Sequence, residues 1–516
     1  MSKLIEQLQS LEIQDLITQK KNDADLEYAF KHVFTQESVY NSLLRSDRHQ
    51  LHQRVGEALE ALLGDKLEDQ ALLLAYHFER GKNQTRALKY LKIAAMNASK
   101  SYANQEAREL YSRALALLDK DDYSGRWDLL AEREQILNRL GEREQQATDL
   151  TLMQTLAELM ADDRRLATTH NRRAAYFDKI SEYQAAAEAA AVGLRIARRA
   201  GNSRLEAQSL NLLALAAWRR FDYREVQKWA NQALDALRVA GDPVGRITSL
   251  LHLGRASYRL GQYDAALNYI QAAQELATDT DNRDSDALAD LILGWIYQRL
   301  GYYDRAKEHY QLNLDKRCLI GDRYGEATAL SHLGWLAYDQ QQCQEGLRYC
   351  LEALDISQTI SDRENQAYAL GGLALNHEHL DNLDIAKTNY EEALVIHQEI
   401  GATTLAIFDQ AGLARIALGQ QNPDMARQYI TNVVEWIRAG KAQQFWDPWF
   451  IYQSAYQVLT TLAETDVAWI ILDEAHTLLH QRAKEISDPE LRRYFLENVT
   501  VNQAIERAWQ TVRGDG

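Results

Sequence analysis

The stretch Ala468–Gln481, AWIILDEAHTLLHQ, holds the residues that come closest to a catalytic motif. Apolar residues lead into Asp473-Glu474-Ala475-His476, the order of a box whose carboxylate holds magnesium in nucleotide-driven helicases. Nucleotide hydrolysis of this kind also needs a GxxxxGK[ST] loop, because the backbone N–H groups of that loop cradle the phosphates. No such loop occurs, and the only Gly-Lys pairs, at 81–82 and 440–441, are followed by Asn and Ala. The sequence therefore does not support nucleotide hydrolysis.

The same stretch is predicted to be a helix rather than a buried strand. Its apolar residues continue through the box at the three- and four-residue spacing of one helix face, after a capping Thr465. Asp473 and Glu474 are then expected on the solvent side. The residues of the apolar face are Val467, Ile471, Ala475, Leu478, Leu479 and Ile486.

Metal binding is the other chemistry that this helix could support. Asp473, His476 and His480 stand at i, i+3 and i+7, so one helix face could offer zinc a carboxylate and two imidazoles. A fourth ligand is not evident, and a solvated polar face is the favoured interpretation, so no metal or other cofactor is predicted. His377-Glu378-His379 is weaker still, because adjacent residues point in different directions on a helix. No Ser-His-Asp or Cys-His arrangement can be argued, and we expect no enzyme.

Composition limits the class of protein and of partner. The 516 residues carry a net charge of −16, which opposes binding to nucleic acid or to an anionic membrane. No window approaches the roughly 20 apolar residues of a membrane span, and the N-terminus has no signal-peptide core. The three cysteines form no CxxC pair, and Cys343 and Cys350 are interpreted as packing residues of one helix. The absence of a disulfide framework fits a reducing cytoplasm. With only four prolines, the chain is expected to be almost wholly helical.

An internal repeat organises most of the chain. Loop residues return about every 40 positions, for example at Gly201, Gly241, Gly321 and Gly401, and Leu-Gly or Leu-Ala pairs keep the same register. Each unit has two amphipathic helices, and in one of them Gly261 stops the first helix near the start of the second. The small residues Gly254 and Ala266 are expected where two helix backbones cross closely. Further columns of the repeat are Tyr183, Tyr223, Tyr263 and Tyr303, and Ala186, Ala266, Ala306, Gly346, Ala386 and Ala426.

This pattern resembles the tetratricopeptide repeat, in a 40-residue form whose helices are longer than those of the standard 34-residue repeat. The resemblance rests on the Leu-Gly pair, the Gly-x-Tyr turn, the small residue and a later Ala-Leu, as at Ala233-Leu234. It implies an all-α fold, a right-handed superhelix of stacked hairpins with a concave inner face.

The N-terminal residues depart from the repeat. Two alternating runs, Asp15–Thr18 and Leu26–Phe30, flank the polar stretch Gln19–Asp25 and predict a β-hairpin, followed by helices from about Thr35 and Ser46. This segment resembles the last part of the winged-helix-like domain that joins the ATPase to the repeat arm in bacterial STAND-type and adenylate cyclase signalling proteins. The matching residues are Tyr28, Phe30, His32, Gln36, Glu37, Tyr40, Leu43, Leu44, Arg48, Leu51 and His52.

Four segments are therefore expected: a partial winged helix (1–45), a helical linker (46–160), the repeat array (161–440) and C-terminal helices with a cap (441–516). In the last segment, Asp488-Pro489-Glu490 has the residue types of a helix start. The aromatic run Phe445–Tyr452 is interpreted as the hydrophobic seam of the cap.

The resemblance also implies a binding groove lined by the first helix of each hairpin. Tryptophan, tyrosine and arginine at the groove positions suit an extended or helical peptide, although the tryptophans could instead pack between repeats. The candidate groove residues are Asn211, Trp218, Thr248, Leu251, Arg255, Tyr258, Trp295, Gln298, Ser331, Trp335 and Tyr338.

Three functions follow from these features. The favoured one is a non-catalytic sensor module that binds a protein or peptide in the groove and regulates a bacterial signalling ATPase or cyclase. The alternatives are a sensor arm for a small ligand or a peptide pheromone, and a metal-dependent enzyme acting through the polar face of the Asp473–His480 helix.

Overall fold

A computed structural model describes residues 2–21, 26–442, 445 and 447–514. Over these residues the chain is all-α apart from one two-stranded hairpin, as predicted. Chain contacts divide it into two compact units, Met1–Tyr176 and Phe177–Gly516, and the boundary falls within α9 (Asp163–Lys179). Among the described residues, no helix is both long enough and apolar enough to cross a membrane.

The first unit begins with a helix, the β-hairpin and a second short helix. The strands pair antiparallel, with Ile17 opposite Phe30. The hairpin is confirmed, but its first strand starts at Ile17 instead of Asp15, because Asp15 has φ 62° in the turn that ends the preceding helix. The elements are α1 (Ser2–Ile13), β1 (Ile17–Lys21), β2 (Leu26–Phe30) and α2 (Val33–Ser42).

The rest of the first unit consists of packed helices around an apolar core. Phe78 of α4 stacks on Tyr90 of α5, with ring centroids 5.7 Å apart. Gly56 of α3 lets Phe78 approach, since an added Cβ would lie 2.9 Å from its ring. The elements are α3 (Arg45–Leu63), the 3-10 helix η1 (Gly64–Lys66), α4 (Ala71–Arg80), α5 (Gln84–Lys100), α6 (Asn104–Leu117), α7 (Tyr123–Leu140) and α8 (Arg143–Leu159).

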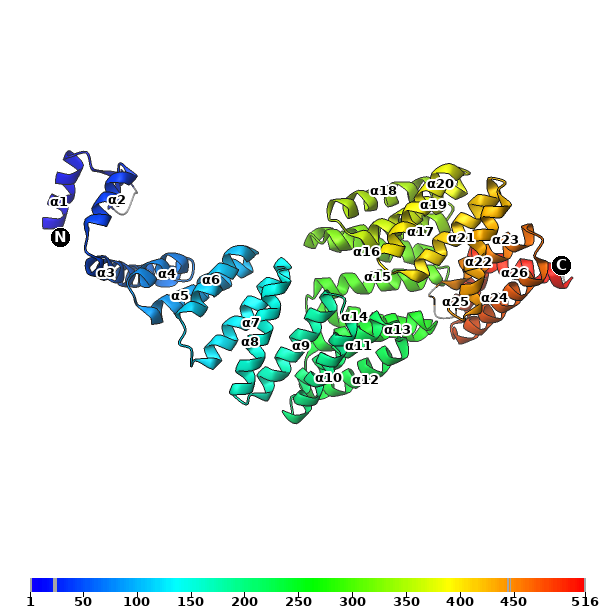
Figure 1. The fold of residues 1–516 in the computed structure, drawn as a ribbon, viewed down its shortest axis with the longest axis horizontal. Helices are drawn as coiled ribbons and strands as arrows, with labels where there is room; N and C mark the ends of the chain where they lie inside the picture. Colours follow the sequence, from blue (N-terminus) through cyan, green and yellow to red (C-terminus); the bar gives the residue numbers. More distant parts are fainter. Residues whose placement is uncertain (1, 22–25, 443–444, 446, 515–516) are drawn as a thin grey trace. The chain divides into compact units, whose positions relative to one another are not determined.

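The second unit is a series of helical hairpins that follow one another in sequence order (Figure 1). The close helix crossing expected at Gly254 is confirmed, because an added Cβ would lie 2.2 Å from Ile270 and 3.5 Å from the carbonyl oxygen of Ala266. The helices of the hairpins are α10 (Tyr183–Arg199), α11 (Ser203–Arg219), α12 (Tyr223–Ala240), α13 (Pro243–Arg259), α14 (Tyr263–Asp279), α15 (Arg283–Arg299), α16 (Tyr303–Ile320), α17 (Arg323–Asp339), α18 (Cys343–Thr359), α19 (Arg363–His379), α20 (Leu383–Glu399), α21 (Thr403–Gly419) and α22 (Pro423–Arg438).

Four further helices end the second unit: α23 (Pro448–Thr461), α24 (Thr465–Glu485), α25 (Pro489–Glu497) and α26 (Thr500–Arg513). Asp488 caps α25 as predicted, accepting hydrogen bonds from the N–H groups of Glu490 and Leu491. Phe445, Trp449 and Tyr452 are buried, which agrees with the predicted seam; Trp446 lies outside the described residues.

These last helices pack against hairpins that lie about 200 residues earlier in the chain. Ser487 donates hydrogen bonds to Asp264, and Asn498 donates its side-chain N–H to the carbonyl oxygen of Gly301 at 3.4 Å. Tyr263 contacts Phe495, with ring centroids 6.0 Å apart, and one hydrophobic core holds residues from Ile247 to Ile505. The helices α23–α26 therefore pack against α13–α16, and we call this packing the closure of the second unit.

One of the turns against which these helices pack has a glycine for a steric reason. The residue between the two helices of a hairpin has a positive φ in successive repeats, and Phe221, Gln341, Asp381 and Gln421 show that other residues adopt it. At Gly301, however, an added Cβ would lie 2.8 Å from the carbonyl oxygen of Tyr494. Docking of α25 at this turn thus leaves no room for a side chain.

Candidate binding surface

The helix that carries Asp473-Glu474-Ala475-His476 belongs to the C-terminal core. It is α24, a continuous helix as predicted, and Asp473 accepts a hydrogen bond from Trp509 Nε1 at 3.2 Å. Two details of the prediction were wrong. Thr465 is the first helical residue, since Glu464 occupies the cap position, and Glu474 is half-buried because it accepts a hydrogen bond from Tyr452 at 2.7 Å.

The cysteines of α18 and the motif at 377–379 make contacts within the fold. Cys343 and Cys350 are both buried in α18, and Cys350 packs against Gly334 and Gly372. Glu378, between the two histidines of 377–379, accepts hydrogen bonds of 2.7 Å from both Nε and Nη2 of Arg415.

First helices of neighbouring hairpins contact one another directly in the pairs α11–α13, α13–α15, α17–α19, α19–α21 and α21–α23. Between α15 and α17 the contact is made by the side chains of Trp295 and His332. Their side chains form what we call the aromatic ladder. Trp335 stacks on Tyr368 at 4.8 Å and lies 5.1 Å from Phe408, which stacks on Phe450 at 4.5 Å. The ladder consists of Tyr258 in α13, Trp295 in α15, His332 and Trp335 in α17, Tyr368 in α19, Phe408 in α21 and Phe450 in α23.

Hydrogen bonds fix the tryptophans of the ladder in place. Trp295 Nε1 donates to His332 Nε2 at 2.9 Å, and Trp335 Nε1 donates to the carbonyl oxygen of Tyr368 at 3.1 Å. Burial, and then the positive charge of Arg259, lowers the pKa of His332 to about 3. The imidazole is therefore neutral at pH 7 and can accept the hydrogen bond from Trp295.

A cluster of cations lies beside the ladder. The guanidinium carbons of Arg255 and Arg259 lie 4.5 and 5.4 Å from the centre of the Trp218 ring. Burial, and then the charges of Arg219 and Arg259, lowers the pKa of Arg255 to about 9. We call Trp218, Arg219, Arg255 and Arg259 the cationic cluster, which is an exception in a chain with a net charge of −16.

Polar groups connect the ladder to the C-terminal helices. Gln298 accepts a hydrogen bond from Tyr310 at 2.6 Å and donates one to Asp339 at 2.7 Å. Arg299 forms an ion pair of 2.6 Å with Asp447, and both side chains are largely buried. Burial raises the pKa of Asp339 to about 6, although the Gln298 hydrogen bond and the charge of Arg299 oppose this rise.

The candidate groove residues fall into two groups. Trp218, Thr248, Arg255, Trp295, Gln298, Trp335 and Tyr338 are half-buried and keep accessible surface. Asn211, Leu251, Tyr258 and Ser331 are buried, and Asn211 donates a hydrogen bond to the carbonyl oxygen of Gly245 at 3.2 Å.

Sequence reasoning did not identify His332, Tyr368, Phe408 or Phe450 as members of the ladder, or Arg259 as a member of the cationic cluster. The repeat itself held a signal for two of them. Tyr368 and Phe408 stand 120 and 160 residues after Thr248, which is three and four periods of the repeat. Extending the column of Thr248 along the array would have placed both of them on the inner helices.

Comparisons with known proteins agree with this architecture. Family models described as tetratricopeptide repeat match residues 247–280, 291–312 and 327–365, which lie within α13–α19. No match is found among curated proteins.

The solved structures that match this chain share little sequence with it. A Rap protein in complex with competence and sporulation factor has a TM-score of 0.53 and 13% identity, over 70% of this chain and 99% of that one. The apo quorum sensor NprR from B. thuringiensis has a TM-score of 0.49 and 14% identity, over 70% and 99%. A STAND protein with a tetratricopeptide repeat sensor from Pyrococcus horikoshii has a TM-score of 0.48 and 16% identity, over 77% of this chain and 59% of that one.

Proposed function

We propose that this chain, a tetratricopeptide-repeat protein, is a non-catalytic sensor module that binds an extended peptide or protein segment along its inner helices. The observation that carries the proposal is the row of aromatic rings on the first helices, with the cationic cluster beside it. Four of these rings are half-buried: Trp295, Trp335, Tyr368 and Phe450. Partly exposed tryptophan, tyrosine and arginine are the side chains that contribute most to protein interfaces.

The chemistry of the surface suggests the character of the ligand. Flat aromatic faces bind apolar side chains, and Trp295, Trp335 and Tyr368 come from three successive first helices, so a ligand in contact with all three must be extended. The cationic cluster favours a carboxylate or another anionic group near one end of the ligand. The Rap protein found in complex with competence and sporulation factor supports a ligand-binding role for this fold.

The proposal of a regulated partner is based on the N-terminal segment of the first unit. The segment that resembles signalling ATPases places Tyr40 OH 3.0 Å from His52 Nε2, and Arg80 donates to the same hydroxyl at 3.2 Å. These contacts join α2, α3 and α4, so a regulated ATPase or cyclase is proposed to act through this end of the first unit.

The test is binding to defined peptides. A display library of extended peptides with apolar side chains and one acidic end is selected against the intact chain, and the dissociation constants of the selected peptides are measured. Trp295→Leu together with Trp335→Leu is expected to weaken binding by about tenfold or more, because two hot-spot contacts are lost.

The matched control is Trp229→Leu, which removes a half-buried tryptophan from α12, the second helix of a hairpin. This control is expected to retain the affinity of the unchanged chain. Equal affinity in the double variant with unchanged helicity would exclude the ladder as the binding surface.

A further inference from the structure

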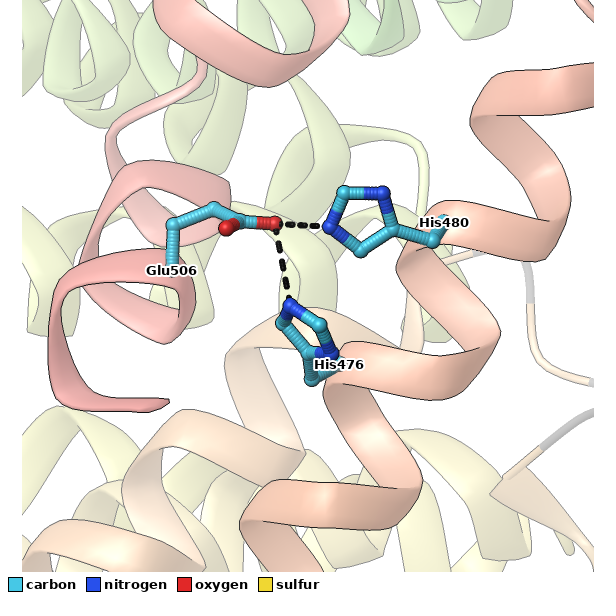
Figure 2. Close-up of side chains that lie close together, drawn as sticks. All are labelled: His476, His480 and Glu506. Carbon is cyan, nitrogen blue, oxygen red and sulfur yellow. Dashed lines mark ion pairs between the residues drawn. The ribbon is translucent and has the colours of Figure 1, made fainter. Parts of the chain in front are cut away.

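Three side chains from two helices meet at the C-terminal end of the second unit. His476 and His480 stand one turn apart on α24, and both rings face the carboxylate of Glu506 on α26 (Figure 2). Glu506 Oε1 lies 2.5 Å from His480 Nε2 and 3.6 Å from His476 Nε2. All three atoms lie within 4.8 Å of one another, which is close enough for them to bind one ion.

The position of His476 is fixed by its neighbours. Its ring stacks on Trp509 with 3.9 Å between centroids and 3° between planes, and it lies 4.4 Å from the ring of His480. Trp509 is held in turn by its hydrogen bond to Asp473. Asp473 is therefore not a ligand in this arrangement; it orients the ring against which His476 stacks.

The carboxylate oxygen at the centre of the cluster is buried and depends on the two imidazoles for its partners. Glu506 Oε1 faces Nε2 of both imidazoles, and each imidazole can donate to it only while that nitrogen carries a proton. A buried carboxylate oxygen is costly without a partner. A cation between the oxygen and the two nitrogens would satisfy all three atoms.

We propose that His476, His480 and Glu506 form a zinc site that joins α24 to α26. Two imidazole nitrogens and one carboxylate oxygen suit zinc, whereas magnesium and calcium prefer sets of oxygen ligands. Three protein ligands leave a coordination position for water or for a group from another molecule. This site is independent of the aromatic ladder, since no residue is shared between them.

The test is zinc binding to the tag-free, metal-stripped full chain, measured by competition with a chromogenic chelator and by calorimetry. We expect one zinc ion per chain at this site and a higher unfolding temperature when zinc is present, because a ligand that binds only the folded state stabilises it. Cobalt in place of zinc is expected to give the visible absorption of a tetrahedral site with nitrogen and oxygen ligands.

Variants on both helices keep the proposal testable if one of them folds poorly. His480→Gln on α24 and Glu506→Gln on α26 are each expected to weaken zinc binding by about 100-fold and to abolish the cobalt spectrum. The control is His379→Gln, which removes a histidine at the end of α19, far along the chain from the cluster. The proposal would be overturned if the unchanged chain does not bind zinc. It would also be overturned if both glutamine variants bind zinc as tightly as the unchanged chain.

Discussion

The aromatic ladder and the aromatic run at Phe445–Tyr452 look alike in composition, yet they have different surroundings. Trp295 and Trp335 of the ladder keep accessible surface and use their ring N–H groups to join neighbouring helices. Trp449 of the run is fully buried and packs edge-on to Phe495 of α25, with ring centroids 6.3 Å apart. Aromatic residues on helices of one repeat protein are thus left partly accessible in one region and covered in the other, depending on which helices pack over them.

The largest effect is expected where closure depends on a single side chain. Trp449→Ala should lower the free energy of unfolding of the second unit by about 3–5 kcal/mol, because it leaves a cavity in the core. Trp295→Ala should lower it by no more than about 2 kcal/mol, because part of that ring is already exposed. Chemical unfolding followed by circular dichroism compares the two, and equal losses would remove the distinction between the regions.

The ion pair between Arg299 and Asp447 links the two regions, and its loss should rank next. Asp447→Ala leaves the guanidinium of Arg299 buried without this carboxylate, which is expected to cost about 3 kcal/mol. The control is Asp235→Ala, which removes a carboxylate of an exposed ion pair with Arg238. A loss no greater than that of the control would mean that the pair does not hold the closure.

Gly301 provides a sharper steric test of closure. Gly301→Ala and Gly321→Ala share almost the same backbone strain, with φ values of 74° and 71°, but only Gly301 faces the carbonyl oxygen of Tyr494. We expect both to cost about 1 kcal/mol from strain, and Gly301→Ala about 2 kcal/mol more from displacement of α25. Equal unfolding midpoints for the two variants would contradict tight docking of α25 at this turn.

The smallest expected effect is a pH dependence of the free energy of unfolding. It comes from Asp339, which lies where polar groups connect the ladder to the C-terminal helices. Burial raises the pKa of Asp339 to about 6, above its value in the unfolded chain, so the folded state binds the proton more tightly. The stability from this group is fully present below about pH 4 and is lost as the pH rises through about 6.

Asp339→Asn should remove about 2 kcal/mol of this pH dependence, because an amide does not titrate. Unfolding midpoints measured from pH 4 to pH 7 test it, with Asp235→Asn as an exposed control. Parallel curves for Asp339→Asn and the unchanged chain would show that Asp339 does not titrate in this range.

Much of the local structure could be predicted from the sequence. The repeat period, the helical hairpins, the crossing at Gly254, the cap at Asp488 and the N-terminal β-hairpin all depend on residues that are close in the chain. The missing phosphate-binding loop and the periodicity through 468–481 were also enough to place Asp473-Glu474-Ala475-His476 on a helix.

The errors and omissions concern groups that meet across long stretches of chain. Asp473 was grouped with His476 and His480 because they share a helix face, but the carboxylate that faces both imidazoles is Glu506, on α26. The ladder was only partly identified, because its contacts depend on the angle at which successive hairpins stack. Tyr368 and Phe408 meet Trp335, and Phe450 meets Phe408.

The sequence by itself thus determined the helices, their pairing into hairpins and the glycines and caps at their ends, because helix periodicity and backbone sterics act over a few residues. Only the tertiary structure decided that Ser487 reaches Asp264 and that α25 lies against Gly301. Each hairpin adds a small rotation to the stack, and these rotations sum over many repeats. Which distant helices meet, and which aromatic rings they leave accessible, depends on that sum.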